Sequence, residues 1–358
     1  MITNSAKNGL IPQREFFDKD IANTENTNGY YIIKKGDFVY NPRKSLDAPY
    51  GPIRMYSYED LGIVSPLYLC FRANIDIINS FYEWFFKSSS WYRYIYMYGD
   101  NGARHDRVSI RDNLFFNMSL SIPSTKEQLK ISTFLTLIEK RIKLQEELVS
   151  NLKSYKRGLI NHIFEENFDI LKGTGWQDYK LSEILKERKI YSEKDGTYEH
   201  ATLSKDGVSG KTERYDRDFL VASNDKKYKI TKLGDICYNP ANLKFGVICL
   251  NTYGDAIFSP IYVTFEVNSN FNKEFIGLCL TRNNFINKAL QYQQGTVYER
   301  MAVSPEDLLS MHVKLPPKYI QDKLSKMVLL YNCELLKAED SLSYLLQLKN
   351  KLLREMFI

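Results

Sequence analysis

Residues 34–42 read KKGDFVYNP, and residues 232–240 read KLGDICYNP. Six of these nine positions are identical, and both segments end in Tyr-Asn-Pro. Self-similarity at a fixed offset indicates an internal repeat, which has to be recognised before any local structure is assigned. Residue 34 corresponds to residue 232, so the offset here is 198 residues.

The repeat extends in both directions along the chain. AKNGLIPQREFFDKDI (6–21) is echoed by SKDGVSGKTERYDRDF (204–219), again at offset 198. The sequence Ser-Pro-x-Tyr at 65–68 recurs at 259–262, with an offset of 194. The sequence GARHDR (102–107) recurs as GTVYER (295–300), with an offset of 193. The offset of 193 then holds to the end of the chain. We conclude that the chain is one unit written twice.

The composition is typical of a soluble globular protein. With 358 residues, 44% apolar and 26% charged, about two domains are expected. No apolar run approaches the ~20 residues of a membrane span, and the polar start MITNSAKNGL does not resemble a signal peptide, so a cytoplasmic protein without membrane contact is expected. The five cysteines form no CxxC pair and the four histidines no ligand spacing, so we expect reduced thiols and no metal site.

The net charge of +6 permits a nucleic-acid partner without proving one. Aromatic residues reach 14%, with 26 Tyr and 20 Phe. The favoured interpretation is β-rich cores filled with aromatic side chains, and base stacking is the alternative. The densest stretch, FYEWFFKSSSWYRYIYMY (81–98), is expected mainly to pack a core or to dock a partner subunit.

Each unit divides into a strand-like head and a long helix. Short runs of Tyr, Ile, Val and Phe between Gly, Asn and Pro are typical of strands, whereas the segments from about Thr125 to Phe164 and from about Lys318 to Phe357 are helical in pattern, with prolines just before them. The predicted fold class is α+β, with two duplicated β-rich heads each followed by a long α-helix. The predicted parts are head 1–122, helical region 123–168, head 169–315 and helical region 316–358.

Both helices carry an apolar stripe with a period of 3.5 residues, which is typical of coiled coils. We expect the two helices to pair as an antiparallel coiled coil through this seam, each over about 60 Å. Lys156 and Lys349 interrupt the two stripes at the equivalent step; the favoured interpretation places them near a frayed end, and the alternative is that they fix the register. The predicted seam consists of Ile131, Leu135, Ile138, Ile142, Val149, Leu152, Leu159, Leu324, Val328, Leu335, Leu342, Leu345 and Leu352.

At this level of detail the sequence resembles the specificity (S, HsdS) subunit of type I restriction-modification systems. The resemblance covers nearly the whole chain, although each motif is short. It rests first on the alternation of head and helix. It also rests on short motifs, which are WQDYKLSEI (176–184), Gly36-Asp37 and Gly234-Asp235, Ile122-Pro123 with Glu127-Gln128, Leu315-Pro316-Pro317 with Gln321, and Tyr155–Ile160 with Ile163-Phe164. Trp176 would map some 22 residues before Met1 in the first unit, so that head is expected to be shortened or trimmed at its start, and Ile320 and Asp322 depart from the helix junction usual in the family.

The resemblance implies a non-catalytic, DNA-reading subunit whose heads are target-recognition domains. Each head would read one half of a bipartite double-stranded DNA target, and the helices would set the gap. Two methyltransferase (M) subunits and the restriction (R) subunits would be its partners. S-adenosylmethionine, ATP and Mg²⁺ would then be bound by those partners, with no cofactor on this chain.

The residues themselves argue against a methyltransferase. Tyr-Asn-Pro-Arg (40–43) and Tyr-Asn-Pro-Ala (238–241) lack the second proline and the aromatic residue of the Asn-Pro-Pro-aromatic loop of amino-methylating enzymes. No P-loop is present either. The alternative that remains open is a coiled-coil scaffold whose duplicated heads bind proteins.

Candidate DNA-contacting residues lie in three loops of each head. Arg suits bidentate contact with guanine and Asn with adenine, while Lys and Arg meet phosphates. Asn41 and Asn239, which precede proline in both units, are predicted to be structural, because residues that read sequence should differ between the heads. The candidates are Lys7, Arg14, Arg43, Lys44, Arg104, His105 and Arg107 in the first head, and Lys205, Lys211, Arg214, Asn242, Lys244, Tyr298 and Arg300 in the second.

Overall fold

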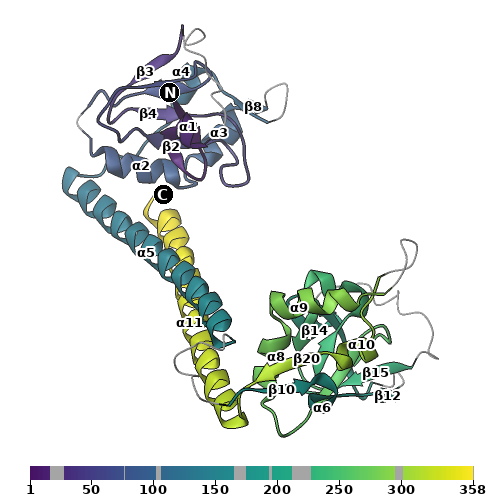
Figure 1. Cartoon of the computed structure of the whole chain (residues 1–358). Helices are drawn as coiled ribbons and strands as arrows, with labels where there is room; N and C mark the ends of the chain where they lie inside the picture. Colours follow the sequence, from purple (N-terminus) through teal and green to yellow (C-terminus); the bar gives the residue numbers. More distant parts are fainter. Residues whose placement is uncertain are drawn as a thin grey trace. The chain divides into compact units, whose positions relative to one another are not determined.

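The computed structural model describes residues 1–16, 28–75, 77–101, 106–164, 175–192, 196–211, 227–294 and 301–357. The chain forms two compact units (Figure 1). Unit 1 consists of Met1–Val149 with Lys337–Ile358, and unit 2 of Ser150–Leu336. Each unit therefore contains one head and a part of both long helices. Among the described residues, no helix is both long and apolar enough to cross a membrane.

Unit 1 begins with a head of short antiparallel strands. The hairpin β1 (Ile2–Ser5) and β2 (Gly9–Pro12) leads into α1 (Gln13–Phe16). A pair, β3 (Tyr31–Ile33) with β6 (Gly62–Val64), lies beside a sheet in the order β5 (Ile53–Met55), β4 (Phe38–Tyr40), β7 (Leu69–Phe71). The head continues through α2 (Asn79–Lys87), α3 (Tyr92–Tyr98), the hairpin β8 (Asp100–Asn101) and β9 (Val108–Ser109), and α4 (Asp112–Phe116).

The core of unit 1 is aromatic, as expected for the stretch 81–98. Phe81, Trp84 and Trp91 are at most 3% exposed. They pack in one cluster with Phe38 and Tyr40 of the sheet and with residues of both long helices. The aromatic excess of this head therefore builds its core, although Tyr96, Met97 and Tyr98 at the end of α3 are exposed.

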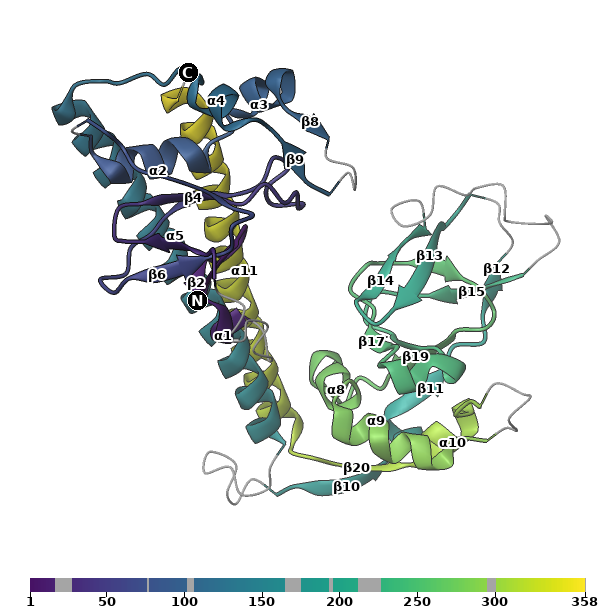
Figure 2. The ribbon, with the colours of Figure 1, turned by 90° about the horizontal axis from the view of Figure 1, so that it is seen from above.

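Unit 2 repeats this plan with additional strands (Figure 2). One sheet has the order β11 (Leu185–Glu187), β19 (Val263–Val267), β16 (Ile236–Tyr238), β17 (Ile248–Leu250). The other has the order β12 (Tyr191–Ser192), β15 (Tyr228–Thr231), β18 (Ala256–Phe258), β13 (Glu199–Ser204), β14 (Gly207–Gly210), and β10 (Gln177–Lys180) pairs with β20 (His312–Leu315). The helical elements are α6 (Leu181–Ile184), η4 (Pro240–Phe245), α8 (Lys273–Leu280), α9 (Asn283–Ala289), η5 (Leu290–Tyr292) and α10 (Pro305–Ser310).

The repeated Lys-x-Gly-Asp sequence forms the same turn in both units. Gly36 and Gly234 have φ of 90° and 91°, a region that favours glycine. The carboxylate of Asp37 accepts the N–H of Lys34 at 2.8 Å, and that of Asp235 accepts the N–H of Lys232 at 2.9 Å. The turn starts strands β4 and β16, which are both fully buried.

A buried glutamine joins each head to its long helix. Gln128 donates to Pro123 O at 2.8 Å and accepts the N–H of Ile78 at 3.0 Å. Gln321 donates to Pro316 O at 2.8 Å and accepts the N–H of Asn272 at 3.0 Å. Both side chains are at most 2% exposed, so the Pro–Gln junction noted in the sequence has the same structural role twice.

The long helices are α5 (Thr125–Ile163) and α11 (Lys318–Met356), as predicted to within one residue at each end. In unit 1 the two helices run antiparallel. Gln145 of α5 donates to Ala338 O of α11 at 2.9 Å. Glu139, which precedes Gln145 in α5, binds Lys349, which follows Ala338 in α11, at 2.9 Å. In unit 2, Ile163 near the end of α5 joins a core cluster that contains Leu324 and Val328 of α11. None of the thirteen predicted seam residues is exposed, and the α+β fold with paired long helices is confirmed.

The favoured expectation for Lys349, a place near a frayed end, is wrong. The ammonium group of Lys349 is held 2.9 Å from Glu139 Oε1 in α5, while Lys87 of α2 lies 3.2 Å from Glu139 Oε2. The Lys349 side chain is only 22% exposed. This contact favours the alternative interpretation, in which a polar seam residue fixes the register of the two helices.

Candidate nucleic-acid interface

Four of the predicted DNA-contacting residues come together in unit 1. Lys7, Arg43, Lys44 and Arg107 line one open depression of about 550 Å³. They come from three segments that are far apart in the sequence, namely the β1–β2 turn, the stretch after β4 and the start of β9. The fold therefore converts three predicted loops into one surface.

Two of these loops are joined by backbone hydrogen bonds. Val108 N–H donates to Pro42 O at 2.9 Å, and Lys44 N–H donates to Asp106 O at 2.8 Å. Arg43 and Arg107 are opposite each other in an antiparallel bridge. Their side chains therefore start from neighbouring backbone positions, and both residues line the depression.

The β1–β2 hairpin is fixed to the sheet by a buried asparagine. Asn4 is 3% exposed, and its Nδ2 donates to Val39 O at 2.8 Å and to Pro52 O at 3.0 Å. Arg54 holds the turn itself by donating to Ala6 O at 2.9 Å. Lys7 lies exposed in the turn between β1 and β2. The hydrogen bonds of Asn4 and Arg54 hold this hairpin against the sheet.

The depression is rich in cationic groups. The four basic side chains share its wall with Asp47 as an acidic neighbour. Arg43 Nε is 4.0 Å from Asp106, but its side chain is 67% exposed, so this ion pair contributes little. Cations on a concave surface of this kind attract polyanions and lower the free energy of binding by releasing counterions.

Asn41 and Asn239 have the structural contacts that the sequence suggested. Asn41 Nδ2 donates to Asn4 O at 3.0 Å, and its Oδ1 accepts the N–H of Arg43 at 3.1 Å. Asn239 Oδ1 accepts the N–H of Ala241 at 3.1 Å at the start of η4. Both side chains therefore shape the loop that follows the buried strand.

In unit 2 the corresponding candidates lie on two neighbouring elements. Lys205 is exposed in the turn between β13 and β14, and Lys211 directly follows β14. Asn242 and Lys244 are exposed on η4. The hairpin and the end of η4 are brought together by one small core cluster, which includes Ala201, Leu203, Cys237 and Val247.

Several predicted residues are not part of these surfaces. Arg14 lies on α1 and does not line the depression of unit 1. Arg104, His105, Arg214, Tyr298 and Arg300 lie outside the described residues.

Sequence reasoning missed the polar floor of the depression. Tyr68 and Tyr30 line it together with Thr3 and Gln13. The hydroxyl groups of Thr3 and Tyr68 are 3.4 Å apart, and unit 2 repeats this contact between Thr202 and Tyr262 at 3.4 Å. The repeated Ser-Pro-x-Tyr sequence was the signal that could have pointed to Tyr68.

The buried thiol of Cys237 and the partly buried thiol of Cys70 are unsuited to nucleophilic chemistry. Burial raises the pKa of Cys237 to about 12 and that of Cys70 to about 11. A thiol is reactive only as a thiolate, so these two groups are poor nucleophiles at neutral pH.

Comparison with known proteins connects the chain to solved structures only. No family model and no curated protein matches the sequence. The fold matches the HsdS subunit from Thermoanaerobacter tengcongensis with a TM-score of 0.51 at 16% identity, over 91% of this chain and 81% of that chain. It also matches the type I restriction-modification S subunit from M. genitalium with a TM-score of 0.52 at 16% identity, over 95% and 87% of the two chains.

A third similar structure comes from work on complex assembly and conformational transition of the type I restriction-modification system. Its TM-score is 0.54 at 14% identity, and the match covers 90% of this chain and 82% of that one. All three matches span both heads and both helices, because each covers at least nine-tenths of the chain. The resemblance seen in the sequence is thus confirmed at the level of the fold, and the chain has the fold of the specificity subunits of type I restriction-modification systems.

Proposed function

We propose that this chain is the DNA sequence-specificity subunit of a type I restriction-modification complex. Its two heads read the two halves of a bipartite target, and it acts as a non-catalytic scaffold for methyltransferase and restriction subunits. The observation that carries the proposal is the duplicated head–helix unit, whose first copy gathers Lys7, Arg43, Lys44 and Arg107 at one depression.

The chemistry of this depression suits duplex DNA. Lys7 and Lys44 can meet phosphates, and the guanidinium groups of Arg43 and Arg107 can reach base edges or bridge two phosphates. In the second head the position of Arg43 is taken by Ala241 and that of Lys44 by Asn242. Different side chains at equivalent places support the reading of two different half-sites.

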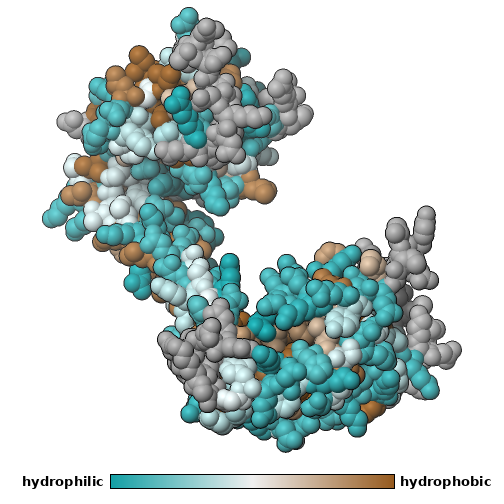
Figure 3. Space-filling view, viewed as in Figure 1, coloured by the Kyte–Doolittle hydropathy of each residue, from teal (hydrophilic) through white to brown (hydrophobic). Residues whose placement is uncertain are grey.

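Exposed apolar residues on α5 support partner binding. Phe134, Leu137, Leu144 and Leu148 are 44–60% exposed and recur at heptad spacing outside the seam. Figure 3 shows brown patches that interrupt the polar surface of unit 1 and its long helix. Apolar rows of this kind on a helix mark protein interaction sites, which suits the docking of methyltransferase subunits.

S-adenosylmethionine, ATP and Mg²⁺ would be bound by the partner subunits.

Salt-dependent binding tests the nucleic-acid interface directly. The full chain, in complex with its methyltransferase subunit, is titrated with target duplex between about 50 and 200 mM salt. Removing a phosphate-contacting cation reduces the slope of log K against log salt by about 1, so R43A or K44A should weaken binding and flatten the slope. K143A, which removes an equal charge from the exposed face of α5, is the matched control and should leave both unchanged.

The same titration distinguishes this proposal from the alternative of a coiled-coil scaffold whose heads bind proteins. A scaffold whose heads bind proteins would show no salt-sensitive duplex binding. It would also respond alike to R43A and K143A.

A further inference from the structure

One loop in each head carries an exposed apolar residue among basic residues. In unit 1, Leu46 is fully exposed in the loop after β4, which also contains Arg43 and Lys44. In unit 2, Phe245 is 64% exposed at the end of η4, directly after Lys244. Both loops follow the repeated Tyr-Asn-Pro sequence, so they are the two copies of one loop.

The two copies differ in length and sequence but are anchored in the same way. The loop spans residues 42–50 in unit 1 and residues 240–245 in unit 2. In each copy the next residue is a glycine whose N–H donates to a buried residue of the loop, to Ala48 O at 3.0 Å and to Leu243 O at 2.9 Å. A large apolar side chain is therefore exposed from both loops although their sequences have diverged.

The loop of unit 1 is held in shape by its own hydrogen bonds. Ser45 N–H donates to Ala48 O at 3.0 Å, and Ala48 N–H donates to Ser45 O at 3.2 Å and to Ser45 Oγ at 3.1 Å. Leu46 lies between these two bonded residues, at the tip of a tight turn. Its neighbours Ser45 and Asp47 line the cation-rich depression, so Leu46 stands at the border of the candidate DNA surface.

Phe245 is positioned by the buried side of η4. Leu243, two residues earlier, is 0% exposed and belongs to the main core cluster of unit 2. The ammonium group of Lys244 lies 5.0 Å from the centre of the Phe245 ring. An anion that binds this ammonium group would therefore lie next to the ring.

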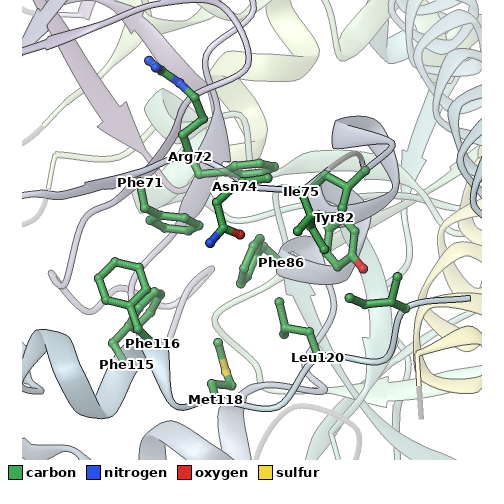
Figure 4. A pocket seen from close by; sticks show the side chains of 14 residues that line it. Phe71, Arg72, Asn74, Ile75, Tyr82, Phe86, Phe115, Phe116, Met118 and Leu120 are labelled. Atoms are coloured by element: carbon green, nitrogen blue, oxygen red, sulfur yellow. The ribbon is translucent and has the colours of Figure 1, made fainter.

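Other apolar side chains of unit 1 are accounted for by its core. Phe71, Phe86, Met118 and Leu120 line an apolar groove of about 200 Å³ (Figure 4). All four belong to the aromatic core cluster of this head or pack against it. Leu46 differs from them, because its side chain is fully exposed on a turn next to basic residues.

The charge around Leu46 and Phe245 favours DNA over protein as their ligand. Lysine is depleted at protein–protein interfaces, whereas surfaces that bind phosphates concentrate Lys and Arg. Leu and Phe are among the side chains that DNA-bending proteins insert between neighbouring base pairs. Cations that bind the adjacent phosphates can hold such a side chain against the stacked bases.

We propose that Leu46 and Phe245 are wedges, each of which inserts between two base pairs of its own half-site, partly unstacks them and bends the duplex. The inference rests on the proposed function, because it requires the heads to bind DNA. Pyrimidine–purine steps are the most easily unstacked. Each wedge thus selects a flexible step in its half-site without a hydrogen bond to a base.

Bending of each half-site tests the two wedges separately. The complex of the full chain with its methyltransferase subunit binds a duplex that carries the motif mapped by methylation. A donor fluorophore is placed outside one half-site and an acceptor in the unspecified gap, and a second duplex carries the same pair around the other half-site. Energy transfer between the fluorophores then reports the bend within one half-site at a time.

The wedge variants should lose the bend one half-site at a time. L46A should straighten one half-site and F245A the other, and each should weaken binding on the order of tenfold. Neither variant removes a cation, so the slope of log K against log salt should stay that of the wild type. L46M keeps a long apolar side chain and should keep the bend. L61A, which shortens a 71% exposed leucine outside the depression, is the matched control and should change nothing.

Three results would overturn the wedges and leave the proposed function intact. The first is a bend that L46A and F245A do not alter. The second is weaker binding by these variants at an unchanged bend, matched by replacing thymine with uracil, because the residues would then contact thymine methyl groups. The third is unchanged DNA binding with reduced capture of the methyltransferase subunit. A wild-type complex without salt-sensitive duplex binding would contradict the wedges and the proposed function together.

Discussion

At the scale of single residues, Glu139 makes contacts that the sequence did not predict. The ammonium groups of Lys87 and Lys349 lie 3.2 Å and 2.9 Å from its two carboxylate oxygens. Partial burial acts to raise the pKa of Glu139, but the two lysines outweigh it and hold this pKa below its usual value. The period of the stripe identified Lys349 as a polar seam residue. It could not identify Lys87, because that contact depends on how α2 packs against α5.

Substitution of Glu139 should therefore have a pH-dependent effect on stability. E139Q is expected to lower the free energy of unfolding at pH 7 by about 1 kcal/mol, a figure discounted for the 41% exposure of this side chain. A carboxyl with a lowered folded-state pKa contributes stability above its unfolded-state pKa and loses that contribution as the pH falls through the folded-state value.

Urea unfolding of the wild type and E139Q at pH 7 and in acid measures this difference. The two proteins should differ at pH 7 and converge in acid. E147Q, at an exposed position of the same helix, is the control and should match the wild type at both pH values. A deficit of E139Q that persists unchanged in acid would show that the lysine contacts do not cause it.

At the scale of elements, the helices were more predictable than the strands. The helix bounds follow from a 3.5-residue period and a constant offset of 193, and α5 and α11 agree with them to within one residue. The strands of the heads are mostly three or four residues long, and β13 pairs in parallel with β18 across more than fifty intervening residues. Such pairings depend on tertiary packing, so composition indicated a β-rich head without its topology.

The exposed apolar row of α5 should be required for complex assembly. L137E combined with L144E is expected to reduce capture of the methyltransferase subunit at least about tenfold, since two apolar contacts of ~1 kcal/mol or more would be lost. Both side chains are more than half exposed, so the melting temperature should stay close to that of the wild type. Pull-down of co-expressed subunits measures assembly, and E147K on the same helix is the control. Full assembly by the double variant would exclude this row as the docking site.

The length of the helices should set the gap in the DNA target. Insertion of one heptad into α5 after Val149 and one into α11 after Leu336 preserves the seam and lengthens each helix by about 10 Å. We expect the unspecified gap to grow by about three base pairs, since a base pair rises ~3.4 Å, while both half-site sequences stay the same. Methylation mapping reads both quantities. A longer chain with an unchanged gap would contradict the role of the helices as a spacer.

At the scale of the whole molecule, duplication was the feature that sequence alone established most firmly. It predicted two similar heads and two similar helices, and the turns at Gly36 and Gly234 and the junctions at Gln128 and Gln321 repeat in the structure. The order of the strands within each head was not visible in the sequence, because strand pairing depends on tertiary packing. The pairing of Asp37 with Arg72 in unit 1 and of Asp235 with Arg188 in unit 2 also depends on three-dimensional packing, so the sequence alone did not indicate it.

Adenine methylation mapped by long-read sequencing tests the central claim most directly. Bacteria that lack other modification systems express the cognate methyltransferase subunit with this chain, with its R43A variant, or without it. Methylation should occur at one split motif with two defined half-sites, should weaken or relax in one half-site with R43A, and should vanish without the chain. Methylation at the same motif in the absence of this chain would contradict its assignment as the specificity subunit.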